Sequence, residues 1–343
     1  MKKFFWIFTM ALLSVGCSDK LDTSSGSLVF SMADLEAGNV DFSVSNYWVI
    51  TDTDIDSLGY VLLSQTLGSI TEEGSISLCF KYLNTEINAA ETLEEGLFYN
   101  CSALATLYMP KAPSIGNYTF ASCLNLTEVK LPEVTYLDYS VFTGCSALTT
   151  ISMPSLSSVS SSLFKDFANL KDVNIDAATS IENSGFRNCT SLEDISMPKA
   201  ITIGQYAFYE CSALTDVYAP NVTSVETSAF QYCSSLKEIS LPELIDVGGY
   251  SFSNCENLEE IYFPKVETLG KLAFAYCTSL KTIYIATKSI ISSIGSSLFT
   301  ESSTEEATIY IDATANASYV DLENKIFDGT YTMYDIVDYP EAE

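Results

Sequence analysis

The sequence predicts a solenoid of stacked 22-residue coils, in which each coil contributes one parallel β-strand and helices are few or short. Three observations support this prediction. Cysteine follows a repeated phenylalanine by three residues in every unit except one, where Phe167 takes its place, and leucine follows three residues later. Alternating apolar residues come next, and proline closes seven of the nine units. The phenylalanine itself recurs every 22 residues, at Phe98, Phe120, Phe142, Phe164, Phe186, Phe208, Phe230, Phe252 and Phe274.

Each unit ends in a pattern that is typical of a β-strand. Alternating apolar positions such as Ile239 and Leu241 indicate a strand with one buried face. Proline ends the strand because its nitrogen cannot donate a ladder hydrogen bond. A single unit of this length cannot bury its own apolar face, whereas stacked units share a continuous core. After the strand and its proline, each unit has two further apolar positions, and a turn is expected just past the second of them. Glycine occurs at this point in five units: Gly116, Gly204, Gly248, Gly270 and Gly295.

Composition excludes several classes of function. The formal charge is −28, with 16 basic and 44 acidic residues, which argues against nucleic-acid binding and favours a cationic partner. The chain has no histidine, so catalysis with an imidazole base and zinc sites that need histidine are excluded. Chemistry with a pair of carboxylates remains open. We therefore predict no cofactor and no metal.

Residues 1–16 are predicted to be a secretory signal peptide. Lys2 and Lys3 precede thirteen uncharged residues, from Phe4 to Gly16, which are too few to span a membrane. No other segment is long and apolar enough to span one.

The end of this segment, LSVGC, resembles the lipobox of bacterial lipoproteins, in which the cysteine becomes lipidated. Ser14 stands where that motif has leucine, and Leu13 lies one residue further back. The resemblance implies that Cys17 is the lipid attachment site. An ordinary signal peptide followed by an unmodified cysteine is the alternative. Residues 17–26 are small and polar, as expected of a lipidated tether.

The remaining boundaries follow from the register of the repeat. Residues 27–73 hold short β-like runs outside the register and are predicted to form an N-terminal β cap or a small β domain. The array is assigned to residues 74–311, with Ile76 projected onto the phenylalanine position and Cys79 onto the cysteine position. Its register slips by three residues at Ile291 and by one more at Ile309. Residues 312–343 are assigned to a C-terminal cap and tail.

The unit Phe-x-x-Cys-x-x-Leu-x-x-Ile-x-Leu-Pro, preceded by Ile-Gly-x-x-Ala as at residues 203–207, resembles the BspA-like class of leucine-rich repeats over about 70% of the chain. The resemblance implies a right-handed, curved leucine-rich-repeat solenoid with a parallel strand on one face. It also implies a bacterial surface protein, often an outer-membrane lipoprotein, that adheres to host matrix or to other cells.

The repeated cysteines are expected to form one column together with Cys79. We interpret them as small buried apolar residues with free thiols. A metal-binding or redox column is the alternative, but Phe167 cannot replace a ligand or a disulfide partner. Neighbours in such a column also point in parallel, which is poor disulfide geometry. The eight repeat positions are Cys101, Cys123, Cys145, Cys189, Cys211, Cys233, Cys255 and Cys277.

Two outward positions flank the buried residue of each strand, and these are the candidate ligand surface. The position before it is acidic in six units, at Glu128, Asp172, Asp194, Asp216, Glu238 and Glu260. The position after it carries tyrosine in four units, at Tyr108, Tyr218, Tyr262 and Tyr284. Tyrosine is favoured in binding surfaces, and stacked carboxylates repel one another unless a cation or a basic partner compensates. A merely solvated face is the alternative.

These observations predict a monomeric cell-surface adhesion protein that presents an extended repeat surface to a protein or glycan partner. Its membrane contact would be the lipid anchor alone, and we expect no catalysis. One alternative is an enzyme that acts on a polysaccharide with outward carboxylates of the solenoid. Another is a purely structural spacer in the cell envelope. An enzyme needs a concave site, whereas a binding surface can be shallow.

Overall fold

The computed structural model describes residues 115–285 and 291–302 in full, residues 96, 99 and 100, and a few strands outside these ranges. It divides into two compact units, Met1–Met153 and Pro154–Glu343. Each is described by itself. Among the described residues none is helical, and both units are built from short parallel strands, which confirms the predicted solenoid class.

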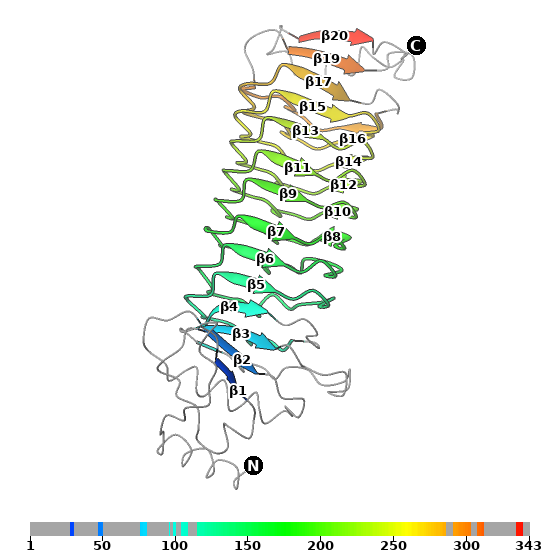
Figure 1. The fold of residues 1–343 in the computed structure, drawn as a ribbon. Helices are drawn as coiled ribbons and strands as arrows, with labels where there is room; N and C mark the ends of the chain where they lie inside the picture. Colours follow the sequence, from blue (N-terminus) through cyan, green and yellow to red (C-terminus); the bar gives the residue numbers. More distant parts are fainter. Residues whose placement is uncertain are drawn as a thin grey trace. The chain divides into compact units, whose positions relative to one another are not determined.

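The first unit is a parallel ladder whose strands pair in chain order (Figure 1). The last three strands keep the predicted register, because Thr106 pairs with Glu128 and Glu128 pairs with Thr150. The strands are β1 (Leu28–Phe30), β2 (Tyr47–Ile50), β3 (Ile76–Phe80), β4 (Leu104–Tyr108), β5 (Glu128–Lys130) and β6 (Thr150–Ser152).

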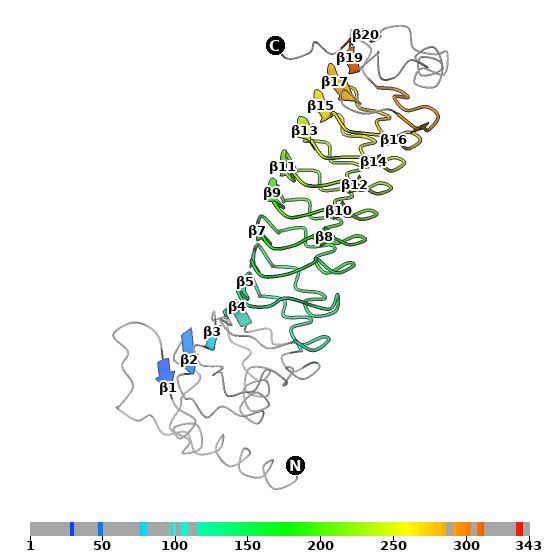
Figure 2. The same ribbon diagram turned by 90° about the vertical axis from the view of Figure 1, so that its right-hand side faces the viewer.

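The second unit carries parallel ladders on two opposite sides of its coils (Figure 2). The first side is the predicted one, with β7 (Asp172–Asn174), β9 (Asp194–Ser196), β11 (Asp216–Tyr218), β13 (Glu238–Ser240), β15 (Glu260–Phe263), β17 (Thr282–Ile285), β19 (Ala307–Ile311) and β20 (Tyr334–Asp338). The second side holds two-residue strands: β8 (Ser180–Ile181), β10 (Thr202–Ile203), β12 (Ser224–Val225), β14 (Asp246–Val247), β16 (Thr268–Leu269) and β18 (Ser293–Ile294).

Stacked phenylalanine rings form the centre of the core. Phe208 has no exposed surface, and its ring lies 5.4 Å from that of Phe186 and 5.1 Å from that of Phe230, with nearly parallel planes. In the second unit the stack runs from Phe164 to Phe299 with centroid distances of 5.1 to 5.5 Å. The 22-residue period therefore places one buried aromatic ring above the next.

Seven repeat cysteines are buried and free, as the sequence predicts. Their thiols also have a role that the sequence did not reveal. The Cys233 Sγ donates a hydrogen bond of 3.2 Å to the carbonyl oxygen of Phe208, one coil earlier, and five other cysteines make the same contact at 3.1 to 3.2 Å. Ser302 takes this position in the last coil and donates its hydroxyl to the Phe274 carbonyl. The column thus supplies one buried donor to each of these phenylalanine carbonyls.

One expectation is contradicted by the structure. The projected first unit is wrong, because Ile76 and Cys79 lie on strand β3, and Cys79 pairs with Tyr108 instead of joining the cysteine column. Turns do begin directly after Gly204, Gly248 and Gly270, as expected, but the left-handed backbone of the coils lies at other positions. Left-handed backbone falls two residues after each repeat phenylalanine and, except at Phe142, two residues before it, as at Tyr206 (φ 57°) and Glu210 (φ 61°) around Phe208.

Several glycines instead permit close approach between coils. A Cβ on Gly270 would lie 2.3 Å from the Gly249 nitrogen, and one on Gly248 would lie 2.5 Å from the Thr227 nitrogen. The absence of a side chain is therefore what these positions require.

The signal peptide, Cys17 and the tether of residues 18–26 lie outside the described residues. So do most of the N-terminal cap and of the C-terminal segment. In the described parts of these regions, β1 and β2 continue the parallel ladder, and β20 pairs with β19.

Candidate functional site

The outward side of the ladder that begins with β7 in the second unit, called the strand face here, brings together the predicted surface residues of that unit. In strands β9, β11 and β13 the central residue is buried and both flanking residues are exposed. A parallel strand directs alternate side chains to opposite faces, so the buried residue fixes where its two neighbours point. The strand face therefore consists of the two outward columns, one acidic and one rich in tyrosine.

The acidic column is in register over neighbouring coils. Asp194 pairs with Asp216 in the β9–β11 ladder, and Glu238 pairs with Glu260 in the β13–β15 ladder. Asp172 occupies the same position on β7, and all five of these residues are exposed. Like charges in directly opposed positions repel, so each pair costs some stability unless a positive group approaches.

Lysine side chains neutralise part of the negative charge in and beside the acidic column. In the first unit, Lys130 forms an ion pair with Glu128 on the same strand. In the second unit, the Lys281 ammonium donates a 2.8 Å hydrogen bond to Glu259, and this contact lowers the pKa of the Glu259 carboxyl. Among the described residues no ion pair involves Asp194, Asp216, Glu238 or Glu260.

The tyrosine column forms an aromatic ladder in the second unit. Tyr262 pairs with Tyr284, and their ring centroids lie 5.8 Å apart with planes at 64°. Tyr284 pairs with Tyr310, and these rings stack at 4.7 Å and 13°. Tyr310 was not among the predicted surface residues, because the 22-residue register shifts before β19. Tyr218, 57% exposed, stands alone on β11, and Tyr108 pairs with Lys130 in the first unit.

A second group of tyrosines was not predicted. The guanidinium of Arg187, the only arginine of the chain, lies 4.9 Å from the ring of Tyr209 and 5.7 Å from that of Tyr206. Tyr232 and Tyr276 are also exposed, 40% and 45%, and follow the phenylalanine of their coils by two residues. These tyrosines lie off the strand face, so they offer internal controls for experiments on it.

The hollow found in the second unit lies on the side opposite the strand face, at β12, β14 and β16, and no acid of the outward column lines it. Within the described ranges no cluster of three or more Cys, Asp or Glu side chains is arranged to hold a metal ion. The described part of the chain contains no helix with the length and hydropathy needed to cross a bilayer.

Comparison with known proteins gives a family and a set of structures. A family model described as a BspA type leucine rich repeat region matches six copies, over residues 54–132, 113–237 and 201–332. No curated protein matches the chain.

Among solved structures, the chain resembles a leucine-rich cell surface protein from Faecalibacterium prausnitzii, with 23% identity and a TM-score of 0.40, over 78% of this chain and 79% of that one. It also resembles a leucine-rich repeat protein from Bacteroides ovatus, with 19% identity and a TM-score of 0.37, over 72% and 87% of the two chains. An internalin from Listeria monocytogenes matches with 11% identity and a TM-score of 0.38, over 75% and 71%.

Proposed function

Since the chain belongs to the BspA-type leucine-rich repeat family, we propose that it is a cell-surface protein that binds a protein partner through its strand face and catalyses no reaction. The observation that carries this proposal is the in-register ladder of Tyr262, Tyr284 and Tyr310. Tyrosine gives a large amphipathic contact at a small loss of conformational entropy, and it is enriched among residues that dominate binding energy.

The acidic column has a different part in this proposal. Its carboxylates sit on a chain of net charge −28, so they attract a basic patch on the partner over a distance of about 10 Å at ~0.1 M salt. Charges at the edge of an interface chiefly raise the association rate. The tyrosines would then set how long the complex lasts, and the acids how quickly it forms.

Paired substitutions separate these two roles. We expect Tyr262→Ala/Tyr284→Ala to weaken binding by about 2 kcal/mol or more, roughly thirtyfold, at any salt concentration. Asp194→Asn/Asp216→Asn should slow association chiefly at low salt and bind like the parent at high salt. The measurement is surface plasmon resonance against a panel of extracellular-matrix proteins at low and high ionic strength.

The matched control is Tyr232→Ala/Tyr276→Ala, which removes two exposed tyrosines away from the strand face. This variant should bind like the parent. If both strand-face variants also bind like the parent, the strand face is solvated surface and the proposal is wrong. Binding of glycans instead of proteins to the same tyrosines would keep the surface and change the class of partner.

We also propose that Cys17 carries a lipid that anchors the protein in the outer membrane. The uncharged run before it is too short to span a bilayer, yet a cysteine follows it directly. The protein should partition into the detergent phase of a Triton X-114 extraction, and Cys17→Ala should move it to the aqueous phase. A variant that still partitions with the detergent would place the anchor elsewhere.

A further inference from the structure

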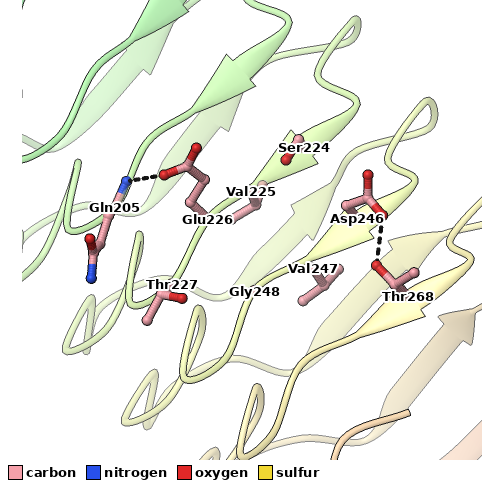
Figure 3. A pocket seen from close by; sticks show the side chains of 9 residues that line it. All are labelled: Gln205, Ser224, Val225, Glu226, Thr227, Asp246, Val247, Gly248 and Thr268. Atoms are coloured by element: carbon pink, nitrogen blue, oxygen red, sulfur yellow. Dashed lines mark hydrogen bonds between the residues drawn. The ribbon is translucent and has the colours of Figure 1, made fainter. Parts of the chain in front are cut away.

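A polar hollow of about 340 Å³ lies on the second side of the coils, opposite the strand face. Ser224, Asp246 and Thr268 line it from strands β12, β14 and β16. Gln205, Glu226 and Thr227 line it from the adjoining segments (Figure 3). Its size fits a small ligand of about one or two sugar rings.

The sequence creates this hollow at the residue that follows each strand of the second side. That position alternates between glutamate and glycine and then stays glycine: Glu182, Gly204, Glu226, Gly248, Gly270 and Gly295. Where it is glutamate, the carboxylate reaches back to a backbone amide of the preceding coil. The Ser161 N–H donates to Glu182 Oε2 at 3.1 Å, and the Gln205 N–H donates to Glu226 Oε2 at 3.0 Å.

Glycine at this position leaves the equivalent amide open. The equivalent amides belong to Thr227, on which Gly248 packs, and to Gly249, on which Gly270 packs, and neither glycine has a side chain that could reach them. Among the described residues neither N–H has a hydrogen-bond acceptor. Glu182 and Glu226 show that the equivalent amides of two other coils bind a carboxylate oxygen.

The lining of the hollow selects for hydroxyl groups. It offers an open N–H donor at Thr227 beside two carboxylates, Glu226 and Asp246, and it contains no lysine or arginine. Asp246 Oδ1 already accepts a 2.7 Å hydrogen bond from the Thr268 hydroxyl. A sugar hydroxyl can accept from the amide and donate to a carboxylate at once, whereas a peptide group separates these functions between its N–H and its C=O.

We propose that this hollow is a binding site for an uncharged glycan, held through its hydroxyls by the Thr227 amide, Glu226 and Asp246. The two carboxylates repel anionic sugars such as uronic acids. The site lies on the opposite side of the coil from the strand face and is independent of the function proposed for that face.

The test follows the backbone amides of the full chain by transverse-relaxation-optimised NMR. The probes are two neutral tetrasaccharides, cellotetraose and mannotetraose, and one charged tetrasaccharide, tetragalacturonate. We expect the Thr227 amide signal to shift with at least one neutral probe, while that of Asp216 on the strand face stays in place. No shift at Thr227 with either neutral probe would overturn the proposal, as would a stronger response to tetragalacturonate.

A matched pair of variants then tests the carboxylates. Asp246→Ala removes an exposed acid from the hollow and should weaken binding of the neutral probe by about tenfold. Glu267→Ala removes an exposed acid that does not line the hollow and should leave the affinity unchanged. Equal affinities for these two variants would overturn the proposal. Both positions are exposed, so neither change should prevent folding.

Discussion

Raising the pH from about 8 to about 11 is expected to unfold the protein, because its buried thiols resist ionisation. Burial raises the pKa of Cys211 and Cys277 from 9.0 to about 12 and raises those of Cys189, Cys233 and Cys255 well above the same value. In the unfolded chain these thiols lose their protons near 9.0. The folded state therefore holds more protons than the unfolded state at alkaline pH.

Because the folded state holds more protons than the unfolded state, the free energy of unfolding falls as the pH rises. The stability contributed by each thiol is complete below the unfolded pKa and is lost as the pH rises toward the folded pKa. A pKa raised from 9.0 to about 12 corresponds to about 4 kcal/mol per thiol that is lost by about pH 12. Two such thiols already approach the net stability of a typical domain, about 5 to 15 kcal/mol. Urea unfolding followed by circular dichroism at a series of pH values measures this loss.

Serine provides the control, because it keeps a donor but does not ionise in this range. Ser302 occupies the cysteine position of the last coil and donates to the Phe274 carbonyl, so the fold accepts this replacement. Cys211→Ser/Cys277→Ser should lose clearly less stability than the parent between about pH 8 and pH 11. If both proteins lose the same free energy, the alkaline transition comes from other groups, such as the lysines or tyrosines.

Truncating one ring of the phenylalanine stack is expected to produce the largest effect of any single substitution. Phe208→Ala should destabilise the protein by about 3 to 5 kcal/mol, as is usual when a buried aromatic side chain is removed. Phe208 has no exposed surface and stacks on both Phe186 and Phe230, so the cavity would lie between two coils that cannot close it without breaking their ladders. The urea midpoint measures the change.

Tyr218→Ala is the matched control, since Tyr218 lies only ten residues further along the chain and is 57% exposed. It should change the free energy of unfolding by less than about 0.5 kcal/mol. A small effect of Phe208→Ala would mean that the ring column does not hold the coils together.

The buried columns of phenylalanine, cysteine and leucine could be predicted from the sequence because the 22-residue period is the same in every coil. Phe208, Cys211 and Leu214 all lie in the core as expected, and the strand of residues 216–218 begins at its predicted place. The projection toward the N-terminus failed because Ile76 and Cys79 matched two column positions without the phenylalanine and leucine that define a coil.

Other features depend on contacts between coils, which a pattern within one unit does not reveal. The strands of the second side, such as β12, are two residues long, too short to show the alternation of polar and apolar residues that indicates a strand. Left-handed backbone falls on residues as different as Tyr206 and Glu210, so no residue type marks it. The thiol donors and the open amide at Thr227 appear only when the 22-residue offset is seen in space.

Oxidative footprinting of the complex with a protein partner tests the central claim, that the strand face is the binding surface. Hydroxyl radicals modify exposed tyrosines, and mass spectrometry compares each site with and without the partner. We expect Tyr218, Tyr262 and Tyr284 to become protected, while Tyr232 and Tyr276, exposed away from the strand face, keep their reactivity. Protection of Tyr232 and Tyr276 with no change at Tyr262 and Tyr284 would contradict this claim.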